Sequence, residues 1–577
     1  MTHRILASFA VLLLAAPARA ADADLILHNG KVVTVDAAFS VGQAVAVGGG
    51  TVVRVGSESD VMALRGPRTQ VVDLGGKTVL PGLIDSHVHP TMAAMTEFDH
   101  PIPDMETIHD VLDYVAARAK AVPAGSWVQV RQVFITRLRE QRYPPRAELD
   151  RAAPKHPVVF STGPDASVNT LALKLSGIDK DFRVTDGGAG YAEKDPATGE
   201  PTGILRNCTR YLKVQTAERE PAEADYAERL LTLFHDYNSV GLTGIIDRNA
   251  PPAALDRYRR LHDRGALTVR IAASHAIGTN APTEKVIEDI RKAAAHPLRH
   301  GGPMLRVVGI KTFLDGGMLT GSAYLREPWG VSRIYAISDP QYRGLLFISK
   351  DRLVQFVRAA TEAGLQFTGH SVGDGAVHTL LEAYEEVGKT TPLRATRPCL
   401  THANFMSKEA IETCARLGVV VDLQPAWLYL DARTLADQFG YDRLRYFQPL
   451  RSLFAAGVVA GGGSDHMQKV GSFRSVNPYN PFLGMQTAIT RRAKGYGRPL
   501  HPEEALSRED AIRFYTINNA RLMFLEDRVG SPEPGKLADL VVLDRDVLTC
   551  PAETIKETRC LRTYLGGKLV YERPSVP

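Results

Sequence analysis

The stretch Val79-Leu80-Pro81-Gly82-Leu83-Ile84-Asp85-Ser86-His87-Val88-His89-Pro90 decides the fold, because an apolar run ends in two histidines one residue apart. Side chains at positions i and i+2 of a β-strand point to the same face, so His87 and His89 can reach one point from the end of a strand. Histidine is the commonest protein ligand of metals at neutral pH. The stretch therefore predicts a buried strand that delivers two metal ligands, and the alternative is an ordinary pair of polar residues at a strand exit.

The size and composition are those of a soluble globular protein with more than one domain. The chain has 577 residues, of which 44% are hydrophobic and 23% charged. A net charge of +5 is small for this length, and there is no Lys/Arg block. Nucleic acid is therefore not an expected partner.

The first twenty residues differ from the rest. Arg4 precedes an apolar segment at 5–16, and Ala18-Arg19-Ala20 is a small-x-small cleavage motif. The pattern predicts a signal peptide over residues 1–20, cleaved after Ala20, and a periplasmic or secreted mature protein. A buried N-terminal helix is the alternative. No later stretch is apolar enough to cross a membrane, so stable membrane insertion is not expected.

Strand signals at both ends of the mature chain predict a small β-sandwich. Asn29-Gly30 favours a two-residue hairpin turn, and Gly566-Gly567 lies within a second hairpin at 562–572. We expect residues 21–80 and 526–577 to pair into one sandwich that is discontinuous in sequence. The five cysteines give no disulfide framework, and only Cys550 and Cys560 are candidates for a bridge across a loop.

The middle of the chain alternates strand and helix signals, which predicts an α/β fold, a (β/α)8 TIM-like barrel over residues 81–525. The long gap after the first strand predicts an inserted α/β subdomain at about 91–220. An open doubly wound sheet is the alternative, but no Gly-x-Gly-x-x-Gly turn supports it. The predicted barrel strands are 83–89, 240–247, 268–275, 305–314, 365–370, 398–402, 419–424 and 458–465.

Polar side chains of metal-ligand type stand at the ends of these strands. In a barrel the carboxyl ends of the strands converge on one mouth, where barrel enzymes place their chemistry. We therefore expect a metal centre there, and the residues that the strand ends supply are His87, His89, Lys311, His370, His402 and Asp465.

The motifs around these residues resemble those of the amidohydrolase superfamily. They read Pro-Gly-Leu-Ile-Asp-Ser-His-Val-His, Gly-His-Ser-Val-Gly-Asp-Gly-Ala-Val, Thr-His-Ala and Gly-Ser-Asp. The chain is similar to amidohydrolase family 3, the branch that includes N-substituted formamide deformylase. The resemblance covers essentially the whole mature chain, including Asn518-Asn519-Ala520-Arg521 and the segment 530–540.

The resemblance implies a site for one or two divalent ions. Zinc suits such nitrogen and oxygen ligands, and iron or manganese fit the same site. The implied ligands are His87, His89 and Asp465 for one metal and His370 and His402 for the other, with Lys311 bridging the two as a carbamate.

The resemblance also implies hydrolysis of a C–N bond in a small amide or formamide. Asp465 would be the general base, and His402 or His370 would steady the oxyanion. Two alternatives stay open, a cyclic amidase or deaminase that uses the same metals, and a binding protein that keeps the fold without turnover. An intact Asp465 argues against the binding protein. The sequence is also compatible with a homo-oligomer.

Several nearby residues are weaker candidates. His466 is expected in a supporting or loop position, and Asp315 at the substrate mouth or in a turn. Pro164 stands where family members often carry a histidine, so the substrate does not follow from the resemblance. Candidates for lining the pocket are His275, Tyr324, Trp329 and Asn169.

Overall fold

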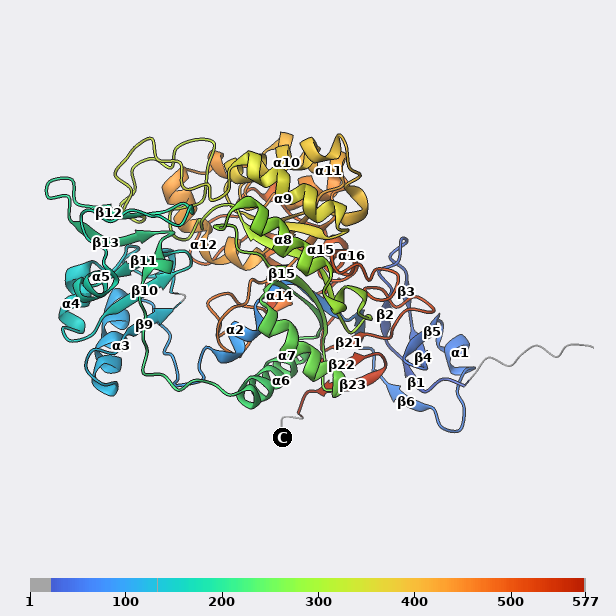
Figure 1. The fold of residues 1–577 in the computed structure, drawn as a ribbon. Helices are drawn as coiled ribbons and strands as arrows, with labels where there is room; N and C mark the ends of the chain where they lie inside the picture. The colour runs from blue at the N-terminus through green and yellow to red at the C-terminus, as the bar shows by residue number, and fades with distance from the viewer. Residues whose placement is uncertain (1–21, 132, 575–577) are drawn as a thin grey trace, which may run out of the picture.

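The computed structural model describes residues 22–131 and 133–574, which form a central barrel with an inserted sheet on one side and the sheets of the chain ends on the other (Figure 1). The predicted signal peptide, residues 1–20, lies outside the described residues. Within residues 22–131 and 133–574, no helix has the length and apolar character needed to span a membrane.

Eight parallel strands form the barrel, which confirms the predicted fold class. Each strand pairs with the next along the chain, in the order β20-β19-β18-β17-β16-β15-β14-β8. The strands are β8 (Leu83–Val88), β14 (Leu242–Ala250), β15 (Arg270–Ala276), β16 (Leu305–Phe313), β17 (Gln366–Ser371), β18 (Cys399–His402), β19 (Val420–Leu423) and β20 (Ala460–Gly462).

The barrel closes where the chain beyond β20 lies against β8. The backbone N–H of Asp465 donates to the carbonyl of His87 at 2.8 Å, and that of His89 donates to the carbonyl of His466 at 2.8 Å. A Cβ atom on Gly463 would lie 2.7 Å from Ser86 Oγ. Only glycine permits this close approach of the first and last strands.

Strand eight is shorter than the predicted 458–465. Regular pairing ends at Gly462, and Asp465 has a φ of 57°, which is outside the β region. The chain therefore turns before the predicted strand ends, and this turn places the Asp465 side chain at the barrel mouth.

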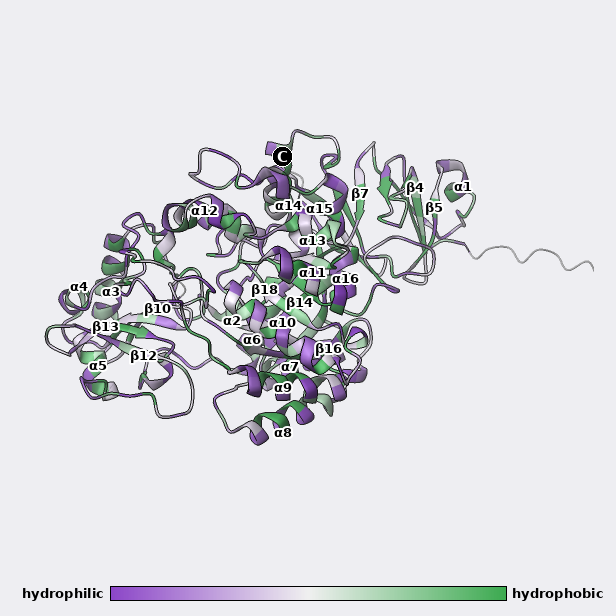
Figure 2. Cartoon of the chain, turned by 90° about the horizontal axis from the view of Figure 1, so that it is seen from above, coloured by the Kyte–Doolittle hydropathy of each residue, from purple (hydrophilic) through white to green (hydrophobic). Residues whose placement is uncertain are grey.

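Helices cover the outside of the barrel and bury one face each. In α8 the buried residues are Val286, Ile290 and Ala293, at helical spacing, and Figure 2 shows hydrophilic and hydrophobic residues mixed along this helix. The helices that follow the strands are α2 (Pro90–Met95), α6 (Glu223–Ser239), α7 (Pro252–Asp263), α8 (Thr283–Ala294), α9 (Lys350–Glu362), α10 (Asp374–Gly388), α11 (Lys408–Leu417), α12 (Pro425–Phe439), α13 (Leu450–Ala455), α14 (Pro481–Thr490), α15 (Arg508–Phe514) and α16 (Ile517–Leu522).

The predicted insertion is a separate five-stranded sheet with its own helices, on the side of the barrel away from β1–β6, residues 25–73 (Figure 1). Its strand order is β12-β13-β11-β10-β9. The elements are α3 (Ile108–Ala121), β9 (Val128–Arg131), α4 (Arg146–Ala152), β10 (Val158–Thr162), β11 (Asp165–Val168), α5 (Thr170–Ser176), β12 (Tyr191–Lys194) and β13 (Pro201–Arg206).

Strands from both ends of the chain form two further sheets that share one apolar core. The four-stranded sheet has the order β5-β4-β1-β6, and the six-stranded sheet has the order β23-β22-β21-β7-β2-β3. These elements are β1 (Leu25–His28), β2 (Lys31–Val33), β3 (Val41–Gly42), β4 (Ala44–Gly48), β5 (Thr51–Gly56), α1 (Glu58–Met62), β6 (Gln70–Asp73), β7 (Thr78–Pro81), β21 (Leu540–Leu543), β22 (Cys560–Leu565) and β23 (Lys568–Glu572).

One turn differs from its prediction. Asn29-Gly30 does not close a hairpin, because β1 belongs to the four-stranded sheet and β2 to the six-stranded sheet. The turn carries the chain from one layer of the sandwich to the other. The hairpin at Gly566-Gly567 is present, with Leu565 paired to Lys568. Cys550 and Cys560 are both free thiols.

A buried ion pair joins the barrel to the terminal sandwich, and its loss should lower stability. Arg270 of β15 donates to both oxygens of Asp539, at 2.6 and 2.8 Å. Asp539→Ala would leave a buried guanidinium without its partner, so we expect the free energy of unfolding to fall by about 3 kcal/mol. Urea denaturation followed by circular dichroism measures this change.

The control is the exposed pair between Arg562 and Glu572, 2.8 Å apart. Glu572→Ala should change the free energy of unfolding by about 0.5 kcal/mol or less, because solvent screens an exposed pair. Equal effects of the two substitutions would show that the buried pair does not hold the sandwich to the barrel.

Candidate metal centre

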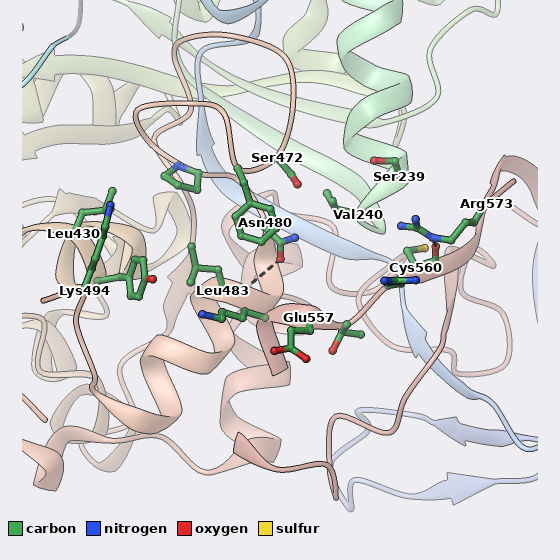
Figure 3. Close-up of a pocket in the computed structure, with 16 residues that line it drawn as sticks. Ser239, Val240, Leu430, Ser472, Asn480, Leu483, Lys494, Glu557, Cys560 and Arg573 are labelled. Carbon is green, nitrogen blue, oxygen red and sulfur yellow. Dashed lines mark hydrogen bonds between the residues drawn. The ribbon is translucent and has the colours of Figure 1, made fainter. Parts of the chain in front are cut away.

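The predicted ligands line one of two large cavities and are absent from the lining of the other. A cavity of about 630 Å³ lies between α12, α14 and the C-terminal segment around Cys560, and none of the predicted ligands lines it (Figure 3). A second cavity, of about 600 Å³, opens at the carboxyl ends of the barrel strands. Its lining includes all six predicted ligands, which are His87, His89, Lys311, His370, His402 and Asp465.

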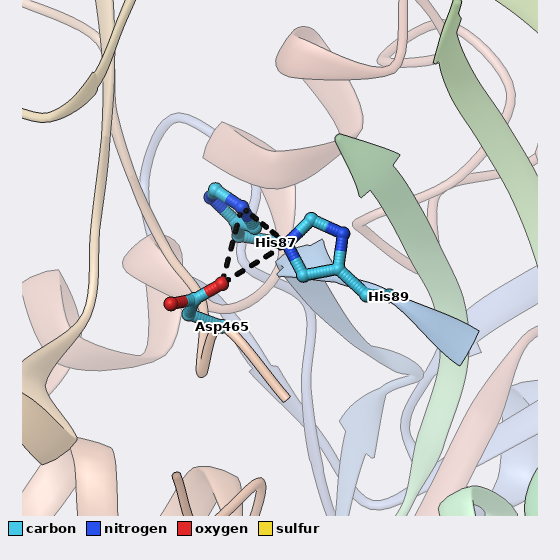
Figure 4. Close-up of side chains that lie close together, drawn as sticks. All are labelled: His87, His89 and Asp465. Atoms are coloured by element: carbon cyan, nitrogen blue, oxygen red, sulfur yellow. Dashed lines mark hydrogen bonds and ion pairs between the residues drawn. The ribbon is translucent and has the colours of Figure 1, made fainter. Parts of the chain in front are cut away.

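Three of these residues bring ligand atoms into direct proximity (Figure 4). Nε2 of His87 lies 3.3 Å from Nε2 of His89 and 3.4 Å from Oδ1 of Asp465, and His89 Nε2 lies 3.1 Å from the same oxygen. Ligand atoms about 2.1 Å from a common zinc ion lie roughly 3.0–3.5 Å apart. The triangle therefore has the size of a metal site.

His370, His402 and Lys311 line the same cavity beyond this triangle. The rings of His370 and His402 have centroids 4.5 Å apart, and His402 stacks on His87 at 4.8 Å. Among the described residues, the buried Nδ1 of His370 has no hydrogen-bond partner. A buried nitrogen without a partner is what a metal ligand looks like when only protein atoms surround it.

A carboxylate behind the site determines which imidazole nitrogens face the cavity. Asp422 ion-pairs with Arg248 at 2.9 Å, and both side chains are fully buried. Its Oδ1 accepts from Nδ1 of His87 at 3.2 Å and from the amide of Gln424 at 3.0 Å. The Gln424 oxygen then accepts from Nδ1 of His402 at 2.8 Å.

This chain of hydrogen bonds fixes both tautomers. The Asp422 carboxylate accepts hydrogen bonds only, so the Gln424 amide turns its NH2 toward Asp422 and its oxygen toward His402. Nδ1 of His402 must then carry the proton, as must Nδ1 of His87. Both imidazoles present an unprotonated Nε2 to the cavity, which is the form that binds a metal.

The electrostatics of the four histidines fit a cation site. Burial lowers the pKa of His370 to about 3 and holds the pKa values of His87 and His402 well below the usual range. Burial opposes charge on His89 too, but the carboxylates of Asp247 and Asp465 raise its pKa to about 9. A proton on His89 balances these carboxylates, and a divalent cation would balance them in its place.

The backbone at two of these positions is held in an uncommon conformation. His402 has a φ of 72° and Asp465 a φ of 57°, both in the left-handed region that non-glycine residues seldom adopt. Asn477 donates to the backbone carbonyl of Asp465 at 2.8 Å and supports this conformation. In this backbone conformation the side chains of His402 and Asp465 both line the cavity.

Two other aspartates shape the strand ends without entering the three-atom cluster. Asp85 accepts from the backbone N–H groups of His87 and Ser464, at 2.9 and 3.0 Å, and so ties β8 to the chain after β20. Asp315 accepts from the N–H groups of Val372 and Gly373, at 3.0 and 2.8 Å, and so holds the turn that follows His370. Asp315 also lines the cavity.

Four of the weaker candidates lie outside the cavity lining. Asn169 caps α5 by accepting from Ala172 N–H, and Trp329 donates to the carbonyl of Ala323. The predictions that they line the pocket are wrong, and so are those for Tyr324 and His275.

His466 takes a supporting position, as expected. Its Nδ1 lies 2.7 Å from the Tyr237 hydroxyl, and its Nε2 lies 2.7 Å from the Lys469 carbonyl. His466 therefore holds the loop after Asp465 in place.

Sequence reasoning missed three residues of the site. Asp422 and Gln424 close the predicted seventh strand at i and i+2, the same spacing that identified His87 and His89, so a strand-end signal was present. Trp427 stacks on His402 with ring centroids 4.8 Å apart and an interplanar angle of 13°. Its position after the strand gave no such signal.

Comparison with known proteins agrees with this geometry. A model of the amidohydrolase family matches residues 70–571. The chain is 32% identical over 578 residues to the N-substituted formamide deformylase of Arthrobacter pascens, covering 95% of this chain and 98% of that protein. The resemblance inferred from the motifs is confirmed.

Solved structures share the fold. An uncharacterized metal-dependent hydrolase from Pyrococcus horikoshii superposes with a TM-score of 0.64 at 22% identity, covering 92% of this chain and 99% of that one. An adenosine deaminase from Xanthomonas campestris, solved with bound zinc, has a TM-score of 0.52 at 16% identity and covers 95% of this chain and 93% of that one.

Asp422→Asn should weaken metal binding. An amide carries no charge and keeps a single acceptor oxygen, so Arg248 loses its counter-charge and His87 is held less firmly. We therefore expect metal affinity to fall by about 10- to 100-fold. Metal retained after dialysis against graded chelator, measured by mass spectrometry, tests this.

The matched control is Asp431→Asn. Asp431 is also a fully buried carboxylate paired with an arginine, Arg137, at 2.8 Å, but it lies on α12 and does not line the cavity. This variant should retain metal as the unaltered protein does. Unchanged metal retention in Asp422→Asn would contradict the orienting role of Asp422.

Proposed function

The chain belongs to the amidohydrolase family, and we propose that it is an exported enzyme that hydrolyses the C–N bond of a small amide or formamide. Membership makes it a metal-dependent hydrolase of C–N bonds other than peptide bonds. The convergence of His87, His89 and Asp465 at one end of the cavity carries the proposal. The substrate class rests on the similarity to the formamide deformylase.

The donor set indicates which residues would hold the metal. His87, His89 and Asp465 would bind one ion, and the free nitrogens of His370 and His402 would bind a second. Zinc suits these ligands, and iron or manganese fit the same set. When bound, a divalent ion supplies Lewis acidity and a source of hydroxide near neutral pH.

Lys311 is the proposed bridge between the two ions. Its side chain is buried, and burial lowers the pKa of its amine to about 8, so a reactive neutral amine is accessible near neutrality. The amine would add carbon dioxide and lose a proton, which gives a carbamate with two oxygen donors. Isotopically labelled bicarbonate should give an NMR signal that Lys311→Met lacks, and the same signal in both proteins would exclude the carbamate.

Asp465 is the proposed general base. Its Oδ1 lies in the triangle, while its Oδ2 lies 3.4 Å from Asn477 Nδ2 and stays available for a proton. Burial raises the pKa of Asp465, which makes the carboxylate a better proton acceptor than an exposed one. It would take a proton from the attacking water and return it to the leaving nitrogen.

His402 is better suited to bind a metal than to donate to an oxyanion. Its single proton lies on Nδ1, which faces Gln424, and burial disfavours a second proton. This differs from the oxyanion role that the resemblance also allowed. His402 would therefore contribute by holding a metal, which when bound would supply the Lewis acidity for the substrate carbonyl.

Turnover by the metal-loaded protein tests the function. The panel contains N-formyl amines, N-acetyl amines, cyclic amides and amidines, with release of free amine or ammonia as the readout. Amine release from formyl or acetyl compounds supports the proposal. Ring opening or ammonia release alone would instead assign a cyclic amidase or a deaminase. Full metal occupancy without turnover of any compound would indicate that the chain is a binding protein and not an enzyme.

Export is a separate part of the proposal and rests on residues 1–20. N-terminal sequencing of the mature protein should begin at Ala21. An intact Met1 in the periplasmic or secreted fraction would contradict cleavage after Ala20.

Asp465→Asn should reduce turnover per bound metal ion by about a hundredfold or more, because an amide does not accept the water's proton. Normalising to bound metal separates the loss of the base from the loss of a ligand. Circular dichroism reports folding alongside. His275→Ala, outside the cavity, should leave turnover unchanged, and a loss of folded protein that matches the loss of rate in Asp465→Asn would exclude the base role.

A further inference from the structure

We propose that the wall of the cavity between the inserted sheet and residues 314–349 binds an apolar group on the substrate nitrogen, and that Arg206 is the positioning residue that holds this wall together. The inference rests on the proposed function, since it concerns the part of the substrate that does not react.

The wall is apolar and comes from three parts of the chain. Phe134 and Pro164 belong to the insertion, Met318 and Leu319 to the segment between β16 and α9, and Trp427 to α12. All but Pro164 belong to one hydrophobic core, which the insertion shares with that segment. Apolar side chains from all three parts therefore contribute to the wall, and Trp427 carries it to His402, on which its ring stacks.

The two charged side chains of the wall, Arg210 and Asp315, are both engaged within the protein, and Asp315 accepts from the N–H groups of Val372 and Gly373. Among the described residues that line the cavity, the one arginine is Arg210, and both of its donor edges are engaged. Its Nε and Nη2 contact the two oxygens of Asp186 at 2.5 and 2.8 Å, and its Nη1 donates to the Ala189 carbonyl at 3.3 Å. A neutral, apolar substituent fits this surface better than a carboxylate or an ammonium group.

Arg206 joins the two halves of the wall from behind. Its side chain is 1% exposed and lies at the end of β13 in the inserted sheet. Nη1 donates to the carbonyl of Thr320 at 2.6 Å and Nη2 to that of Tyr335 at 2.5 Å, both within residues 314–349. Glu193, from the neighbouring strand β12, accepts from Nε at 2.7 Å and anchors the guanidinium to its own sheet.

The residues that Arg206 holds are next to those that line the cavity. Thr320 follows Leu319, and both line it, while Asn207, which follows Arg206 in the inserted sheet, lines it as well. Tyr143 of the insertion adds a parallel link, since its hydroxyl donates to the Thr320 carbonyl at 3.0 Å. Without the guanidinium, the Tyr335 carbonyl would lose this charged donor, and the wall would lose its fixed spacing.

The test compares Arg206→Lys and Tyr143→Phe with the unaltered enzyme on two probes. N-methylformamide has the smallest substituent, and N-hexylformamide extends along the wall. We expect KM for N-hexylformamide to rise about tenfold in Arg206→Lys and less in Tyr143→Phe. We also expect kcat, metal content and kcat/KM for N-methylformamide to change less than about twofold, because the metal residues keep their places.

Arg142→Met is the matched control, because Arg142 lies beside Tyr143 in the insertion but pairs with Glu148 at 3.0 Å, away from the cavity. It should leave the ratio of the two probes unchanged. An equal loss on both probes, or an unchanged ratio in both test variants, would overturn the proposal.

Binding of hexanol to the metal-loaded proteins, measured by calorimetry, separates this inference from the proposed function. Hexanol has no C–N bond, so its binding reports the wall alone. If the unaltered protein releases amine from neither the formyl nor the acetyl compounds of the panel, the proposed function fails. The wall proposal then stands if Arg206→Lys weakens hexanol binding, and it is overturned if hexanol binds both proteins equally.

Discussion

The buried ion pair between Asp422 and Arg248 is the interaction on which the site depends. A carboxylate inside a barrel is costly unless it is paired and hydrogen-bonded, and Asp422 meets both conditions. Because it stays an acceptor, it orients His87 directly and His402 through Gln424. The Asp422 carboxylate lies behind the histidines and does not line the cavity. It thereby determines that the unprotonated Nε2 atoms of His87 and His402 face the cavity.

The rest of the architecture keeps that arrangement rigid. Asp85 and Gly463 allow the first and last strands to meet, so that His87 and Asp465 share one edge of the barrel. The insertion contributes wall residues to the cavity instead of candidate ligands. The candidate metal ligands thus come from the barrel strands, while part of the proposed substrate-binding wall comes from the insertion. The wall can therefore differ in sequence without a change in the metal ligands.

The sequence was sufficient to predict the barrel, the insertion and the placement of six candidate ligands in one cavity. Strand periodicity and the convergence of strand ends explain that success, since both follow from local geometry. The turn at Asn29-Gly30 was predicted wrongly because local turn preference does not say which sheet receives the next strand. The short β20 and the position of Trp427 depend on contacts between distant segments, which no single window of sequence contains.

The pairing of β21 with β7 has a consequence for the order of assembly. Val541 lies opposite Leu80, and Leu80 leads within a few residues to the strand that bears His87. The partner of β7, the strand that leads directly into this first barrel strand, follows all eight barrel strands in the sequence. The strand that precedes His87 therefore gains this sheet partner only after the whole barrel has been synthesised, so the contact closes a long loop in the chain.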